Sequence, residues 1–117
     1  MITKFHPSLT VEKWQAMPWD KRLLNILSEL VRAKNWIKGN NQEYANLSLE
    51  RALELIDLTI ESGMDGKSRF FPRELLRLRE ILAGFYIAPS KNYEEFLVLM
   101  KSFMDLDSSI HNLNLEI

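Results

Sequence analysis

Apolar side chains recur at three- and four-residue intervals in four separate stretches of this chain, and this spacing constrains its fold more than any other feature. Residues three and four positions apart lie on the same side of an α-helix, so each stretch predicts an amphipathic helix. No strand pattern competes with these helices, so the sequence predicts the all-α fold class. The expected apolar faces are Leu23, Ile26, Leu27, Leu30, Ala33 and Ile37 in the first stretch; Ala45, Leu49, Ala52, Ile56 and Ile60 in the second; Leu75, Leu78, Ile81, Leu82 and Phe85 in the third; and Tyr93, Phe96, Leu97, Met100, Phe103 and Met104 in the fourth.

Capping residues indicate where these helices begin and end. Gly39 is expected to take the left-handed conformation that ends the first helix. Asn40 is expected to cap the second helix, with Glu43 reaching back to it, and Asn92 with Glu95 repeats this pattern before the fourth. The expected helices span about residues 19–38, 41–62, 72–87 and 93–109.

Four amphipathic helices with short connections pack most readily as an antiparallel up-and-down four-helix bundle. A chain of 117 residues suits one domain, so a single helical domain is expected over residues 1–117. The segment before the bundle is expected to be irregular, apart from a short helical turn that Thr10 caps and that carries Val11 and Trp14. The C-terminal tail is also expected to be irregular, because a lone strand there would have no partner.

Composition excludes several kinds of chemistry. The chain has no cysteine, only two histidines and a net charge of -1, so thiolate chemistry is excluded and no overall field attracts nucleic acid. No apolar run approaches the length of a membrane helix and no secretory signal is visible, so no membrane contact and a cytoplasmic location are expected. The sequence predicts no catalytic residue, no metal site and no cofactor, and an enzyme is less expected than a non-catalytic protein.

Charge is strongly segregated along the chain. Residues 42–62 hold five acids and one base, a net charge of -4, and residues 67–79 hold five bases and one acid, a net charge of +4. The acids Glu50, Glu54, Asp57 and Glu61 follow one face of the second helix, which is expected to point outward, away from its core face. The bases form a ridge that is the candidate anion site, made of Lys67, Arg69, Arg73 and Arg77, with Arg79 at its border.

Three interpretations of these charges stay open. The two faces can be solvated surfaces of neighbouring helices that form weak ion pairs. The basic ridge can instead bind an anion such as a nucleotide phosphate or RNA, since arginine binds phosphate through its bidentate fork. The acidic face can also bind a basic partner, whereas a catalytic metal centre would require inward-facing carboxylates and a Glu-x-x-His pair that the sequence lacks.

The second helix carries more apolar surface than one core face requires. Tyr44, Leu47, Leu55 and Leu58 lie on its flank, around Arg51, and form the candidate partner surface. A helix of a four-helix bundle buries one stripe, so this flank needs another cover. Two covers are expected: the N-terminal segment with its tryptophans, or a second subunit in a homodimer.

Residues of the first and second helices also carry a family resemblance. The run Leu30–Trp36, then Ala45 and the run Ser48–Ile56, resembles the HEPN-type helical bundles that accompany small nucleotidyltransferases, over about residues 23–87. That resemblance implies an association with nucleotide or RNA chemistry. Some members are ribonucleases in which a histidine follows an arginine after four to six residues, and neither His6 nor His111 stands in that relation to an arginine. The helix order is also similar to flagellar export chaperones, which bind a partner's helix in apolar grooves.

The sequence therefore favours a non-catalytic helical interaction or accessory module that binds a protein partner or a second copy of itself. The alternative is a nucleotide- or RNA-binding bundle that uses the basic ridge of the third helix. These two functions differ in their dependence on salt, because phosphate binding weakens steeply as salt rises.

Overall fold

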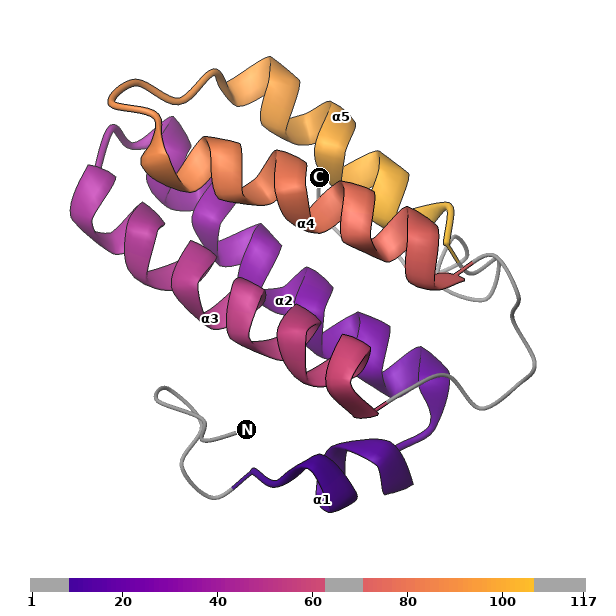
Figure 1. Ribbon diagram of the computed structural model, residues 1–117. Coiled ribbons are helices and arrows are strands. Elements are labelled where there is room, and N and C mark those ends of the chain that lie inside the picture. Colours follow the sequence, from indigo (N-terminus) through magenta and orange to yellow (C-terminus); the bar gives the residue numbers. More distant parts are fainter. Residues whose placement is uncertain (1–8, 63–70, 107–117) are drawn as a thin grey trace.

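The computed structural model describes residues 9–62 and 71–106, which form helices and connections without any strand in those ranges (Figure 1). The all-α prediction is thereby confirmed for the described part of the chain. The helices are α1 (Val11–Ala16), α2 (Trp19–Lys38), α3 (Gln42–Ser62), α4 (Phe71–Ile87) and α5 (Tyr93–Met104). Outside the described residues lie both histidines, the candidate cations Lys67 and Arg69, and the tail after residue 106.

Two of the predicted caps are present. The Thr10 side chain accepts a hydrogen bond of 3.1 Å from the Lys13 amide at the start of α1, and Asn92 accepts one of 2.9 Å from the Glu95 amide at the start of α5. The end of α5 differs from the expected residue 109, because the helix stops at Met104 and residues 105–106 form a turn. The five residues after Met104 are Asp-Leu-Asp-Ser-Ser, and aspartate and serine favour caps and turns over helix interiors.

The joint between α2 and α3 is shifted by one residue from the prediction. Gly39 has φ -84° and needs no special conformation, whereas Asn40 takes the left-handed one, with φ 59°. The cap of α3 is therefore Asn41, whose side chain accepts a hydrogen bond of 3.1 Å from the Tyr44 amide. Asparagine tolerates the left-handed region better than most residues, so the tight turn uses Asn40 in the place expected for glycine.

The core lies between the apolar faces of the four long helices. Small alanines on α2 and α3, namely Ala33, Ala45 and Ala52, are fully buried and allow these two helices to pack closely. Most of the expected core residues are buried, but Ile81 of α4 is 44% exposed and that prediction is wrong, whereas Leu99 of α5 is buried without having been expected. The buried apolar residues are Trp14, Leu23, Ile26, Leu27, Leu30, Ala33, Ile37, Ala45, Leu49, Ala52, Leu55, Ile56, Leu58, Leu75, Leu78, Leu82, Phe96, Leu99, Met100, Phe103 and Met104.

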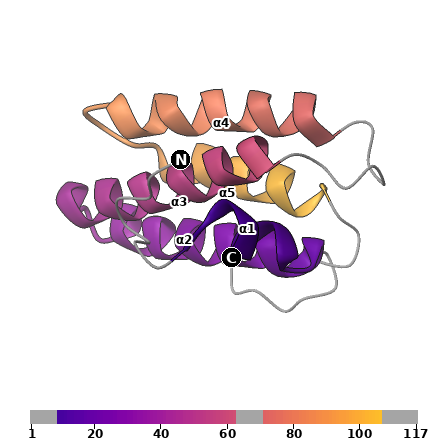
Figure 2. The same ribbon diagram turned by 60° about the horizontal axis from the view of Figure 1, so that its bottom comes forward.

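The arrangement of the helices determines which faces stay open. Successive long helices run in opposite directions, and α2 packs against α3 and α5, while α4 packs against α3 and α5 (Figure 1). The short helix α1 packs against α3. Figure 2 shows α4 and α1 on opposite sides of the molecule, with no described helix beyond α4. None of the described helices combines the length and the apolar character that crossing a bilayer requires.

Candidate functional site

The candidate partner surface on α3 is largely covered by the chain itself. Leu55 and Leu58 are buried, so they are not available to a partner and must be removed from that surface. Their cover includes α1, whose Trp14 is 1% exposed and donates a hydrogen bond of 2.8 Å from Nε1 to the Thr59 hydroxyl of α3. Of the two expected covers, the N-terminal segment is therefore the one that the fold uses at this position.

The two other residues of this surface lie nearer the start of α3. Leu47 is half-buried, and Tyr44 is exposed with its ring against that of Trp36 on α2, at 4.8 Å between centroids. The pair forms a small aromatic patch at the end of the molecule where α2 joins α3. Because the two rings already cover one another, this patch is smaller than the surface that the sequence predicted.

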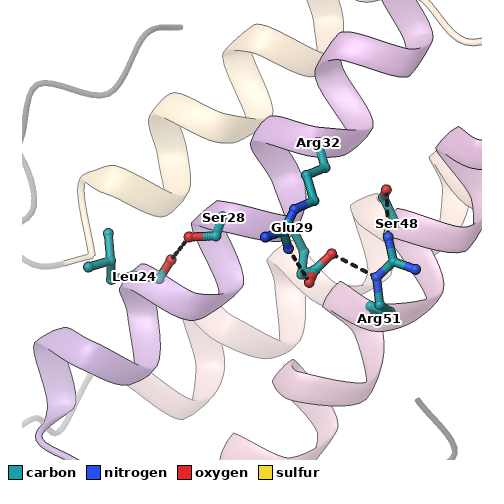
Figure 3. A network of polar contacts seen from close by, with 6 residues as sticks. All are labelled: Leu24, Ser28, Glu29, Arg32, Ser48 and Arg51. Atoms are coloured by element: carbon teal, nitrogen blue, oxygen red, sulfur yellow. Dashed lines mark hydrogen bonds and ion pairs between the residues drawn. The ribbon is translucent and has the colours of Figure 1, made fainter. Parts of the chain in front are cut away.

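Arg51, which the sequence placed among these apolar residues, belongs to a polar network between α2 and α3 (Figure 3). Its Nε donates to Glu29 Oε2 at 2.9 Å, and its Nη2 donates to the buried Ser48 hydroxyl at 3.2 Å. Arg32 donates to the other Glu29 oxygen at 2.6 Å. The Glu29 side chain is only 8% exposed, so both of its oxygens are paired with cations where water has little access.

This network joins two helices and is absent from the sequence prediction, because neither Glu29 nor Ser48 belongs to a periodic charge pattern. Figure 3 also shows Ser28 donating to the Leu24 carbonyl within α2, a local bond that keeps a polar side chain paired on a half-buried face. The network satisfies its own charges and leaves Arg32 mostly exposed. Its geometry explains how α2 and α3 are held in register.

Part of the acidic face of α3 lies against α4 instead of pointing outward as expected, whereas Glu61 is exposed. Asp57 forms a bidentate ion pair with Arg79 of α4, in which the distance between Arg79 Nη2 and Asp57 Oδ2 is 3.0 Å. Glu54 is buried. Glu50 accepts a hydrogen bond from the Tyr86 hydroxyl of α4. The hydrogen bond to Asp57 raises the pKa of Arg79, and that to Glu50, with burial, raises the pKa of Tyr86. The interpretation as paired faces of neighbouring helices is thereby supported for these residues.

The basic ridge is described only in part. Arg73 and Arg77 are exposed on α4 and lie one helical turn apart, whereas Lys67 and Arg69 lie outside the described residues. Arg79 points the other way, toward Asp57. Within residues 9–62 and 71–106, neither Arg73 nor Arg77 forms an ion pair, although Glu74 and Glu80 of the same helix are also exposed.

Four of the exposed large apolar side chains in the described residues belong to α4 and α5. Ile81 is 44% exposed, Ile87 79% and Val98 66%, and Leu76 is also exposed. A pocket of about 210 Å³ lies between the two helices. Ile81, Gly84, Phe85 and Ala88 line its α4 side, and Asn92 and Glu95 line its α5 side.

The floor of this pocket is aromatic. Phe85 meets the fully buried Phe96 edge to face, with 5.2 Å between ring centroids. At Gly84 an added side-chain carbon would meet nothing within 4 Å, so the space above this glycine is open to solvent. The pocket therefore combines an apolar floor, an open wall and one carboxylate at its rim, Glu95.

A second and smaller pocket, of about 60 Å³, lies where the α2–α3 turn meets the α4–α5 connection. Lys91 lines it and donates a hydrogen bond of 2.9 Å to the Ala88 carbonyl, and burial lowers the pKa of Lys91. Gln42 donates to the Pro89 carbonyl at 2.6 Å across the same junction. These hydrogen bonds satisfy backbone carbonyls just after the end of α4, so we interpret the smaller pocket as part of the packing between two connections.

Neither chemistry nor similarity identifies a reaction. Among the described residues, no cluster of histidine, aspartate or glutamate could hold a metal ion. Comparison with known proteins found no match: no family model fits the chain, and neither a curated protein nor a solved structure is similar to it.

Proposed function

We propose that this chain is a single-domain, non-catalytic helical module that binds another polypeptide through the outer face of α4 and α5. In this proposal α2, α3, α4 and α5 form an antiparallel up-and-down four-helix bundle. The alternating directions of these helices and their packing in a ring, each against two others, support this architecture. The scaffold then presents one face of α4 and α5 while α1 covers the other side of α3.

One observation carries the proposal: Ile81 is 44% exposed at the wall of a pocket that Phe85 also lines, and Val98 is exposed on α5 about one helical turn from Glu95, which lines the same pocket. Isolated exposed apolar residues are ordinary, but exposed apolar side chains at and beside a pocket are typical of surfaces that dock another protein. A groove between two helices fits the apolar face of a third helix. The resemblance to bundles that bind a partner's helix points in the same direction.

Photo-crosslinking inside cells tests this proposal. Benzoylphenylalanine replaces Val98, which is exposed on α5 about one helical turn from the pocket-lining Glu95, and in a control variant it replaces Glu12, which is exposed on α1 at the opposite side of the molecule. We expect protein adducts from Val98, their loss when Ile81→Asp is added, and none from Glu12. Adducts that form equally from both positions, or from neither, would show that α4 and α5 do not present a binding face.

A second candidate function is nucleotide or RNA binding by the basic ridge, and the exposure of Arg73 and Arg77 favours it. A fluorescence-anisotropy titration with single-stranded RNA at low and moderate salt tests it. If the ridge binds phosphate, the double variant Arg73→Glu, Arg77→Glu should lose binding, and Lys101→Glu on α5 should retain it. Binding that both variants retain would exclude the ridge as the site.

A further inference from the structure

Four residues on one side of α4 have a symmetric spacing along the sequence. Arg77, Ile81, Gly84 and Ala88 are separated by four, three and four residues, so they lie on one side of the helix. We call these four residues the α4 stripe. The Ala88 amide still bonds to the Gly84 carbonyl at 3.1 Å, so the helical geometry continues through the last member.

A two-fold axis that crosses the α4 stripe midway between Ile81 and Gly84 maps the stripe onto itself. In an antiparallel pair of α4 helices related by that axis, Ile81 of one copy lies opposite Gly84 of the other, and Arg77 lies opposite Ala88. A large apolar side chain then meets the one position without a side chain. The contact between Ile81 of one copy and Gly84 of the other therefore occurs twice, once on each side of the two-fold axis.

The shape of the pocket agrees with this pairing. Ile81 stands 44% exposed at one wall, and the space over Gly84 is empty within 4 Å of where a side chain would begin. The pocket volume of about 210 Å³ exceeds that of an isoleucine side chain. Glycine within an exposed helix is less favourable than alanine, and a close approach by another chain is a physical reason for having it there.

The charges at the two ends of the α4 stripe are complementary. Arg77 is exposed at one end, and Glu95 lines the pocket beside Ala88 at the other end. Within the described ranges neither side chain is engaged in an ion pair. The antiparallel register brings Arg77 of each copy to the end of the groove where Glu95 of the other copy lies, so the symmetric pair contains two opposite-charge contacts.

We propose that the occupant of this groove is a second copy of the same chain, docked antiparallel along the α4 stripe. Ile81 of each copy enters the pocket of the other, and Arg77 of each copy pairs with Glu95 of the other. This inference rests on the proposed function, in that the outer face of α4 and α5 is the binding face, and it names the partner. A single-helix seam is a small interface, so the dimer is expected to form in the micromolar range.

Sedimentation equilibrium of the full chain measures this association, and substitution of Gly84 gives the sharpest variant. In Gly84→Leu the first side-chain carbon meets no neighbour within 4 Å in its own chain, so the leucine grows into the open wall. We expect the dissociation constant to rise at least about tenfold, while the midpoint of thermal unfolding of the monomer rises by about 3 to 5 °C, because leucine favours helix over glycine. Gly84→Ala, the matched control, should raise the midpoint similarly and weaken association less.

A charge exchange tests the register. Arg77→Glu and Glu95→Arg should each weaken the dimer by about tenfold, and the double variant should return to within about threefold of the wild type. A wild-type chain that stays monomeric up to millimolar concentration overturns the dimer. A dimer that Gly84→Leu leaves intact, or whose charge variants do not rescue each other, overturns this register.

The two proposals fail in different ways. If the chain is monomeric and benzoylphenylalanine at position 98 still forms adducts with another protein, the second copy is excluded as the partner and the proposed binding face is supported. A dimer that persists after Ile81→Asp while Val98 forms no adducts shows that the chain associates elsewhere and excludes both. Adducts between two copies from Val98, lost in Gly84→Leu, support both.

Discussion

Single residues decide how the ends of α2 and α3 meet. The sequence points to Gly39 for the left-handed position because glycine is the usual residue there, and the structure uses Asn40 instead. Two adjacent residues that both tolerate positive φ cannot be separated by propensity alone. The hydrogen bonds from the Asn40 and Asn41 amides back into α2 settle the register, and these depend on the whole turn.

The two residues should therefore respond differently to substitution. Gly39→Ala is expected to leave the free energy of unfolding unchanged or slightly higher, because its φ is negative and its new side chain meets only ordinary contacts. Asn40→Gly should stabilise the fold by about 0.5–1 kcal/mol, and Asn40→Ala should destabilise it by a similar amount. Urea denaturation measures all three, and a larger loss for Gly39→Ala than for Asn40→Ala would contradict the turn.

The bond between Trp14 and Thr59 is the second residue-scale feature with a measurable consequence. Thr59 is fully buried, accepts from the Trp14 indole and donates to the Leu55 carbonyl at 2.8 Å. Thr59→Val keeps the shape but leaves the buried indole N–H without its acceptor, which should cost about 1–3 kcal/mol of unfolding free energy. Thr59→Ser keeps the hydroxyl and serves as the matched control. If valine proves as stable as threonine, α1 is not anchored in this way.

Tyr86 supplies a pH-dependent contribution. Its hydrogen bond to Glu50 raises the pKa of Tyr86, so the folded state favours the protonated phenol. This contribution is complete below the ordinary tyrosine pKa of about 10 and is lost as the pH rises through the raised value. The difference in stability between wild type and Tyr86→Phe should therefore be constant below about pH 10 and shrink above it.

An ultraviolet titration of tyrosine ionisation checks the cause. Glu50→Ala should lower the pKa of Tyr86, and Glu43→Ala, at an exposed position of the same helix, should leave it unchanged. Equal titration curves for Glu50→Ala and the wild type would mean that Glu50 does not hold the phenol.

At the scale of the helix, the apolar periodicity predicts where each helix begins and ends better than it predicts which side of the helix is buried. The bounds of α2 match the expected residues 19–38, and α4 starts one residue before the expected 72 and ends at the expected 87. Three acids of α3, Glu50, Glu54 and Asp57, are less exposed than their helical spacing predicts, and Ile81 of α4 is more exposed. A helix's own pattern gives the direction of its apolar side but not the number of neighbours, and α3 has neighbours on several sides.

The helices should also differ in local stability. α2 and α3 share the densest packing, with the buried alanines between them, whereas the buried apolar side chains described for α4 are Leu75, Leu78 and Leu82. Native-state hydrogen exchange should therefore find the slowest amides in α2 and α3 and faster opening in α4. Amides of α4 that exchange as slowly as those in the middle of α2 would contradict this order.

At the scale of the molecule, the sequence indicates that surplus apolar surface exists but not where it ends up. The part of the α3 flank that holds Leu55 and Leu58 is covered, on the side where α1 packs, whereas Ile81 of the predicted core is open. Both outcomes depend on contacts between segments far apart in the chain, which no local pattern records. The exposed arginines were predictable from their helical spacing, as was their opposition to the core face.

Salt should affect association and folding of the whole molecule differently. The contacts proposed between Arg77 and Glu95 of two copies are exposed, so added salt screens them, and the dimer should weaken as salt rises. The monomer's thermal midpoint should change little, because the Glu29 network is largely shielded from solvent. Sedimentation and thermal unfolding across a salt series measure both, and a dimer that salt strengthens would favour a purely apolar seam.

The position of α3, packed against α1, α2 and α4, has a consequence for how the sequence can vary. Almost the whole circumference of this helix meets other parts of the chain, including through its acids, so a substitution on nearly any side must be accommodated by another helix. α4 has a side that meets no other described helix (Figure 2), so substitutions there disturb the fold less, and under the proposed function they alter binding. Under the proposed function, the outermost helix is therefore the part of the fold where a substitution can change the partner at the smallest cost in stability, and α3 is the part where it cannot.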